Sequence, residues 1–261
     1  MKIEMLMSSC RIKKISELKL KEKNIDNTII VNQFAEKERI DKDGNNIMYS
    51  YNEKGIAKSR NRLLEKMSGE IEIITDDDIE FVPNYKEIIE KSYRENDADI
   101  IIFNMKKGDL VMGHDKFFQY NKISIMSICS CQITFRTNSI KNNNLKFNEL
   151  FGIGSKFISG EENIFLKDAL NKGLKIIHIP IIINSHTDED TTGESWNDKV
   201  IISKGALMYE LYKRLYIIFL LYFAIFKHKN YKKNYSFIKF IKLFIKGKKT
   251  YKKTKKSQNR E

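Results

Sequence analysis

Residues 70–83 place the tightest constraint on this chain, because an apolar strand pattern there runs directly into consecutive acidic side chains. The isoleucines at positions 71, 73 and 74 predict a buried strand, and the carboxylates of residues 76–78 follow after a single threonine. Pro83 then ends the extended segment, because proline cannot donate to a strand ladder. Ligands of open α/β sheets bind beyond the carboxyl ends of the strands, so this acidic turn is a candidate ligand site.

Two of these carboxylates are placed to act together. Asp76 and Asp78 are two residues apart, so their side chains point the same way in extended backbone. Hard oxygen ligands of this kind suit Mg²⁺ or Mn²⁺ carrying substrate phosphates. The alternative is a solvated acidic turn that caps the next helix.

Composition indicates an intracellular globular protein. The 261 residues can bury a sizeable core, as one domain or as one domain with an appendage. The three cysteines (Cys10, Cys129 and Cys131) show no metal-ligand spacing, which favours a reducing compartment without disulfides. The N-terminus lacks the features of a signal peptide. We therefore expect the protein to stay in the cytosol.

The positive charge is confined to one end of the chain. Residues 199–261 contain 18 Lys and Arg against two acids, whereas residues 1–198 contain 29 Lys and Arg against 32 acids. The net charges are therefore +16 and −3. Such asymmetry predicts an anionic partner for the C-terminal segment rather than for the body.

The first half of the chain predicts two strands that end in small or polar side chains. Residues 2–10 end in serines and a cysteine, and residues 28–33 end in two amides, which can recognise a base edge through paired donors and acceptors. A helical apolar pattern lies between them, at residues 12–20. We expect the charged segment 36–46 to be a loop and residues 46–51 to be a short strand.

A helix is predicted to open after Gly55, with Arg60 and Asn61 in its second turn. A helix N-terminus and a guanidinium both favour a phosphate. The alternative is an ordinary surface helix with Arg60 in solvent. Beyond the acidic turn, we expect a helix at residues 84–96 and a strand at 98–103.

The later part of the body contains a second informative block. We expect irregular structure over residues 104–122 and a strand over 124–136, and then two glycine-containing turns lead to Glu161 and Glu162 at a helix start. Acids there are favoured by the helix dipole, or one of them serves as a carboxylate base near a sugar hydroxyl. The extended runs that follow end at His186. We expect residues 187–195 to form a mobile loop that can order over a substrate.

With both blocks in place, residues 2–190 resemble the family 2 inverting glycosyltransferases of the GT-A fold, especially bacterial polysaccharide-type enzymes. The segments that carry the resemblance come in the family's order: G-x-A-x-S-R-N at 55–61, D-D-D at 76–78, F-x-E-x-F-G at 147–152, G-E-E at 160–162 and a late histidine, His186. The resemblance implies an α/β fold with a Rossmann-like, mixed but mostly parallel sheet flanked by helices.

The resemblance also implies a donor site at the carboxyl ends of the strands. The donor would be a nucleoside-diphosphate sugar, a UDP-sugar by family habit, and Asp76 and Asp78 match the D-x-D pair that holds Mn²⁺ or Mg²⁺, with Asp78 as the direct ligand. His186 matches a late position that contacts metal or diphosphate in some members, or it simply ends a strand. The implied donor contacts are Ser8, Ser9, Asn32, Gln33, Arg60, Asn61, Asp76 and Asp77.

The acidic pair at 161–162 departs from the family pattern. The family has Glu-Asp there, with the Asp as base, whereas this chain has Glu161 and Glu162. Glu162 stands at the base position and is one methylene longer, and Glu161 is the alternative base.

The resemblance therefore implies a metal-dependent inverting glycosyltransferase with a carbohydrate or lipid-linked acceptor, in cell-surface polysaccharide synthesis. Two alternatives stay open. The first is a metal-dependent nucleotidyltransferase, although no Gly-rich phosphate loop lies between residues 8 and 16. The second is a non-catalytic membrane-bound scaffold on a degenerate transferase fold, which the glutamate at position 162 would suit.

The C-terminal segment 199–261 predicts membrane association, beside a transferase domain at 1–198. The apolar run 215–226 would form a helix of about 18 Å, which is short of the roughly 30 Å hydrocarbon core. Residues 235–246 form a basic amphipathic pattern typical of helices that lie on anionic membranes. We expect residues 213–256 to bind the inner face of the cell membrane rather than nucleic acid, and the last dozen residues to be disordered. The alternative is a helix packed on the body or on another subunit.

Overall fold

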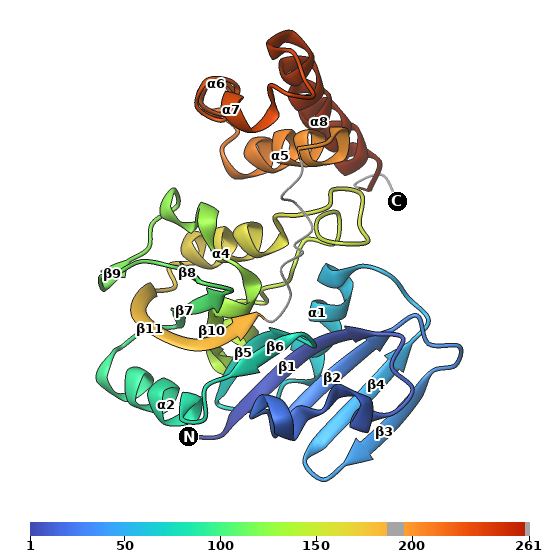
Figure 1. Cartoon of the computed structure of the whole chain (residues 1–261), viewed down its shortest axis with the longest axis vertical. Coiled ribbons are helices and arrows are strands. Elements are labelled where there is room, and N and C mark those ends of the chain that lie inside the picture. The colour runs from blue at the N-terminus through green and yellow to red at the C-terminus, as the bar shows by residue number, and fades with distance from the viewer. Residues whose placement is uncertain (187–195, 259–261) are drawn as a thin grey trace.

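The computed structural model describes residues 1–186 and 196–258, and a mixed sheet forms the centre of its body (Figure 1). The described strands form one eleven-stranded sheet in the order β3-β4-β2-β1-β5-β10-β7-β11-β6, with β8 beside β7 and β9 beside β11. The central parallel strands are β4 (Asn46–Tyr51), β2 (Thr28–Gln33), β1 (Ile3–Cys10) and β5 (Ile71–Asp76).

The other half of the sheet mixes directions. β10 (Ile133–Arg136) runs antiparallel between β5 and β7 (Ile100–Lys107), and β11 (Ile176–His186) runs parallel to β7. β6 (Ile79–Phe81) pairs antiparallel with the end of β11. This architecture confirms the expected fold class.

Alternation along the strands builds a core on each face of the sheet. Met5 and Met7 of β1 join one cluster, and Leu6 between them joins the other, as the period of two requires. The first cluster includes side chains of α2 (Tyr85–Glu95), and the second includes side chains of α1 (Ile56–Lys66) and α4 (Glu161–Asn171). Helices therefore pack on both faces and leave the strand ends open.

Several local expectations were wrong. Residues 12–20 do not form an α-helix. Two short 3-10 helices, η1 (Ile15–Leu18) and η2 (Leu20–Lys23), stand there, because Lys19 takes a left-handed conformation between them. The expected loop 36–46 contains β3 (Arg39–Asp43), which forms an antiparallel hairpin with β4. β3 is an edge strand, where charged side chains stay in solvent on both faces.

The middle of the chain also differs from expectation. The segment 104–122 contains the end of β7 and two short strands, β8 (Leu110–Met112) and β9 (Phe118–Gln119). The expected strand 124–136 is a strand only at β10, and its first part is made of η3 (Ser124–Ser127) and η4 (Ser130–Gln132). A short helix α3 (Thr137–Asn142) follows β10. The expected loop 187–195 lies outside the described residues.

The C-terminal helices form a bundle at one end of the molecule, beyond α4 (Figure 1). They are α5 (Asp198–Leu211), α6 (Tyr216–Phe226), α7 (His228–Tyr231) and α8 (Phe237–Gln258). Their buried side chains share a core with Phe151, Phe157 and Ile164 of the body. The segment expected to be disordered is therefore helical as far as Gln258. No helix within the described ranges is long and apolar enough to cross a bilayer.

The apolar face of α8 packs on the bundle. Phe240, Leu243, Phe244 and Tyr251 are buried. The closest approach is at the crossing with α5, where a Cβ on Gly247 would lie 2.0 Å from the backbone oxygen of Ile202. This face is therefore covered by protein, in agreement with the alternative prediction of a helix packed on the body.

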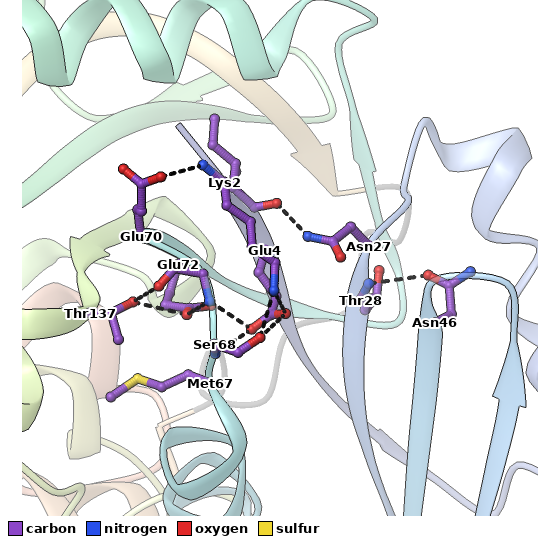
Figure 2. A network of polar contacts seen from close by, with 12 residues as sticks. Lys2, Glu4, Asn27, Thr28, Asn46, Met67, Ser68, Glu70, Glu72 and Thr137 are labelled. Atoms are coloured by element: carbon purple, nitrogen blue, oxygen red, sulfur yellow. Dashed lines mark hydrogen bonds and ion pairs between the residues drawn. The ribbon is translucent and has the colours of Figure 1, made fainter.

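A network of buried carboxylates lies at the N-terminal ends of β1 and β5 (Figure 2). Glu4 of β1 accepts hydrogen bonds from the backbone N–H of Ser68 at 2.7 Å and of Gly69 at 3.2 Å. Glu72 of β5 accepts from Gly69 N–H at 2.9 Å and from Thr137 Oγ1 at 3.0 Å. Burial and the neighbouring Glu4 raise the pKa of Glu72 to about 8.

We predict that Glu72→Gln raises stability at high pH. The pKa of Glu72 is raised on folding, so the folded protein binds more protons than the unfolded chain between roughly pH 4.5 and 8, and wild-type stability falls as pH rises through this window. The variant should lose that slope and exceed wild type at pH 8.5 by on the order of 2 kcal/mol. Urea unfolding at pH 5 and pH 8.5 measures it. Glu70→Gln, at an exposed neighbouring site, should keep the wild-type slope, and an unchanged slope in Glu72→Gln would contradict the prediction.

We predict that Gly247→Ala destabilises the protein. In an exposed helix this change stabilises by about 1 kcal/mol, but here the new methyl meets the Ile202 carbonyl and α8 must move away from α5. We expect a net loss of about 2 kcal/mol or more in the free energy of unfolding. Lys249→Ala, on the exposed side of α8, is the control and should be close to neutral. A gain in stability for Gly247→Ala would show that the helices do not cross here.

Candidate active site

The site lies at the carboxyl ends of the parallel strands, where a pocket of about 660 Å³ opens. The register of β1 against its neighbours sets Ser8 beside Asp76 of β5 and Cys10 beside Gln33 of β2. The pocket wall includes most of the residues singled out from the sequence: Ser8, Ser9, Gln33, Arg60, Asp76, Asp77, Asp78, Glu161, Glu162 and His186.

Two expected donor contacts do not line this pocket. Asn32 is fully buried, and its amide bonds the backbone of Ile12 and the hydroxyl of Ser50. Asn61 bonds the backbone of Phe147 in both directions and donates to Glu149 Oε1 at 2.9 Å. Both amides therefore stabilise the fold. Asn32 holds the loop after β1, and Asn61 joins α1 to the 147–149 segment.

The serines of β1 hydrogen-bond side chains of the acidic turn and of α1. Ser9 Oγ donates to Asp77 Oδ2 at 2.5 Å, and the Asp77 carbonyl accepts from Lys23. Ser8 Oγ accepts from Ser59 Oγ of α1 at 3.0 Å. The acidic turn is thus tied to both β1 and η2, which limits how far its carboxylates can move.

The acidic turn faces the end of β11. His186 Nε2 lies 3.0 Å from Asp78 Oδ2, and the two side chains are 14% and 37% exposed. Burial raises the pKa of Asp78, the His186 side chain lowers it, and the charges of Asp76 and Asp77 raise it further, with a net rise. A cation beside Asp78 would relieve this repulsion.

The donor set fits a hard divalent cation. Asp76 and Asp78 offer carboxylate oxygens, the ligand type that suits Mg²⁺ and Mn²⁺, whereas the imidazole of His186 suits transition metals better than Mg²⁺. Among residues 1–186 and 196–258, however, no three such side chains are already gathered around one point. A metal here would therefore draw part of its ligand shell from elsewhere, as Mg²⁺ does when it binds through substrate phosphates.

Arg60 joins the acidic turn to the start of α4. Its Nη1 lies 2.7 Å from Glu161 Oε1, and its Nη2 lies 3.3 Å from Asp76 Oδ1 and 2.8 Å from Ser130 Oγ. Only 3% of Arg60 is exposed. Burial alone would lower the pKa of Arg60, but the Asp76 and Glu161 charges raise it overall. Both Nη atoms are used inside the protein, so the guanidinium orders the site rather than reaching into solvent.

The two glutamates have different surroundings. Both line the pocket, but Glu161 is buried and held by Arg60, whereas Glu162 is half-buried. Burial and the adjacent Glu161 charge raise the pKa of Glu162 well above its ordinary value. A carboxylate with a raised pKa at a pocket wall can accept a proton near neutral pH.

Sequence reasoning missed several pocket residues. Cys131 Sγ lies 3.5 Å from Asp76 Oδ2, and Ser130 bonds Arg60. The signal that the sequence offered was the spacing of Cys129 and Cys131, which are two residues apart. Lys54 on the loop before α1 and Cys10 at the end of β1 also line the pocket.

Helix α5 reaches the same site from the C-terminal bundle. Ser203 Oγ accepts from the backbone N–H of Ile158 at 2.9 Å, and a Cβ on Gly160 would lie 2.5 Å from Leu207 Cδ2. Burial lowers the pKa of Lys204, while the Glu162 charge acts to raise it. The bundle therefore helps to hold the loop and the helix start that carry the glutamates.

Comparisons with solved structures agree with this fold. The structure is similar to residues 1–349 of Staphylococcus aureus TarS in complex with UDP-GlcNAc, with a TM-score of 0.65 and 15% identity over 95% of this chain and 81% of that one. It is also similar to the same region in complex with UDP, with a TM-score of 0.58 and 16% identity over 90% of this chain and 76% of that one. At these identities the likeness shows a GT-A fold.

Sequence comparisons identify the family. None of the curated proteins compared with the chain matches it. The model of glycosyl transferase family 2 matches residues 26–165, which span β2, the Arg60 helix, the acidic turn and the start of α4. The chain therefore belongs to glycosyltransferase family 2, and it is a glycosyltransferase.

Proposed function

We propose that this glycosyltransferase uses a divalent cation to transfer a sugar from a UDP-sugar to a hydroxyl of a carbohydrate or lipid-linked acceptor, with inversion at the anomeric carbon. The observation that carries the proposal is one pocket with the acidic turn and His186 on its wall together with the exposed part of Glu162. The structures of TarS with UDP-GlcNAc and with UDP support a uridine nucleotide. Cell-surface polysaccharide synthesis is the setting we propose for this activity.

Asp76, Asp78 and His186 would hold the cation, with Mn²⁺ or Mg²⁺ as the candidates. When bound, it would act as a Lewis acid toward the diphosphate leaving group. The protein itself contributes the fixed position of the turn, through Ser9 on Asp77 and Arg60 on Asp76. Ser8 and Gln33 line the same wall and are available to the nucleoside.

Glu162 is the base in this proposal, and Glu161 positions it. Arg60 holds the Glu161 carboxylate, which leaves Glu162 as the glutamate that can take a proton from the acceptor hydroxyl. The acceptor oxygen then bonds to the anomeric carbon while the bond from that carbon to the diphosphate breaks. One displacement without an enzyme nucleophile inverts the centre.

We predict that Glu162→Gln lowers kcat/KM by about 100-fold or more, the usual contribution of a general base, while UDP binding stays within twofold. The base must be deprotonated, so the wild-type rate should fall as pH drops through the raised pKa of Glu162, at a higher pH than for an ordinary glutamate. Steady-state transfer from a UDP-sugar across pH 5–9 measures both. Glu65→Gln, exposed on α1, should leave the profile unchanged. Full activity in Glu162→Gln would remove Glu162 from the base role.

We predict that UDP raises the melting temperature only when Mn²⁺ or Mg²⁺ is present, and that Asp78→Ala loses this shift. A ligand that binds only the native state stabilises by mass action, by about 2.7 kcal/mol at 100 times its Kd. Thermal-shift assays with UDP, other nucleoside diphosphates and EDTA test it. Asp109→Ala, on the turn between β7 and β8 away from the pocket wall, is the control. A full UDP shift in EDTA would show that donor binding needs no metal.

A further inference from the structure

Helix α6 is apolar all around, but the bundle covers only one side of it. Tyr216, Leu220, Phe223 and Ala224 are buried against the bundle core. The opposite face is exposed and consists of Ile217, Ile218, Leu221, Tyr222, Ile225 and Phe226. We call these six residues the α6 face.

The α6 face is a continuous stripe rather than a scatter of single side chains. Its members follow the spacing i, i+1, i+4, i+5, i+8, i+9, which places them on one side of a helix. Ile218 is 62% exposed and Phe226 is 72% exposed. Monomeric soluble proteins rarely leave a contiguous apolar surface of this kind uncovered unless it binds something.

The charges around the α6 face indicate what that partner is. Residues 213–256 contain 15 Lys and Arg and no acid. Lys213 and Arg214 stand exposed just before the helix, and Lys229, Lys232 and Lys233 stand exposed just after it. An apolar stripe with cations at both ends matches the acyl boundary and the headgroups of an anionic bilayer.

The same charges disfavour a second copy of the chain as the partner. Two α6 faces packed about a two-fold axis would bring clusters of like charge together, which costs free energy unless anions intervene. The helix is also too short to cross the bilayer: its 11 residues span about 17 Å, against a hydrocarbon core of about 30 Å. It can lie in the interface but cannot cross.

We propose that the α6 face docks this glycosyltransferase onto an anionic lipid surface, with α6 lying in the plane of the interface. This assigns the membrane contact to α6 and not to the apolar face of α8, which is buried against α5. The cytoplasmic face of the cell membrane is the surface of that chemistry in a cell. The contact is independent of the donor pocket, so its test does not depend on the sugar or the metal.

The test is co-sedimentation of the full chain with vesicles of phosphatidylcholine alone and of phosphatidylcholine mixed with phosphatidylglycerol. Wild type should bind the mixed vesicles, more weakly as salt rises, and should not bind phosphatidylcholine alone. Ile218→Glu combined with Phe226→Glu should weaken binding at least tenfold, because two apolar side chains are lost from the interface and two anions are gained. Both side chains are more than half exposed, so circular dichroism and thermal melting should show an intact fold.

The matched control is Leu110→Glu combined with Val111→Glu, which places the same two charges on β8 side chains that are 71% and 51% exposed, and it should bind like wild type. The proposal fails if wild type does not bind the mixed vesicles. It also fails if the double variant binds as tightly as wild type, because the cations alone would then account for attachment. Light scattering that shows a wild-type dimer and a monomeric double variant would assign the α6 face to a second copy instead.

Discussion

The site depends on one buried cation. Arg60 sits at the end of the central strands and contacts Asp76 on one side and Glu161 on the other. Removing a guanidinium from such a place leaves two carboxylates without their counter-charge, and breaking a buried pair typically costs about 3–5 kcal/mol. The carboxylates in turn keep Arg60 charged. This mutual dependence fixes the distance between the acidic turn and the start of α4. It therefore also fixes the distance between the proposed cation ligands and the proposed base.

The position of the site could be predicted from the sequence, but the partners within it could not. The rule that ligands bind beyond strand ends, with the order of the motifs, was enough to predict that Ser8, Asp76 and Glu162 line one pocket. Arg60 was expected to meet a phosphate, and instead its Nη atoms bond Glu161, Asp76 and Ser130. A guanidinium satisfies a carboxylate and a phosphate by the same geometry, so its partner depends on segments that are distant in the sequence.

The C-terminal segment shows the same ambiguity for apolar faces. A basic amphipathic pattern at 235–246 is compatible with a lipid interface or with a helix on a protein core. The apolar face of α8 packs on the protein core. The signal that distinguishes α6 is that it has no polar face at all. One side of such a helix can satisfy the bundle while the other needs a further apolar partner. The pattern alone does not say which helix is covered, because that depends on how closely α5 and α8 cross at Gly205 and Gly247.

Helix α5 packs between the helix that carries the proposed docking surface and the segment that carries the two glutamates. On its body side, α5 places Ser203 on the backbone of Ile158 and Leu207 against Gly160, directly before the two glutamates. On its other side it packs on α8 and α6 through the same continuous core. Close-packed interiors transmit displacement instead of absorbing it. The orientation of α6 on a surface would therefore fix the orientation of the pocket, so that a lipid-linked acceptor would meet Glu162 from one side only.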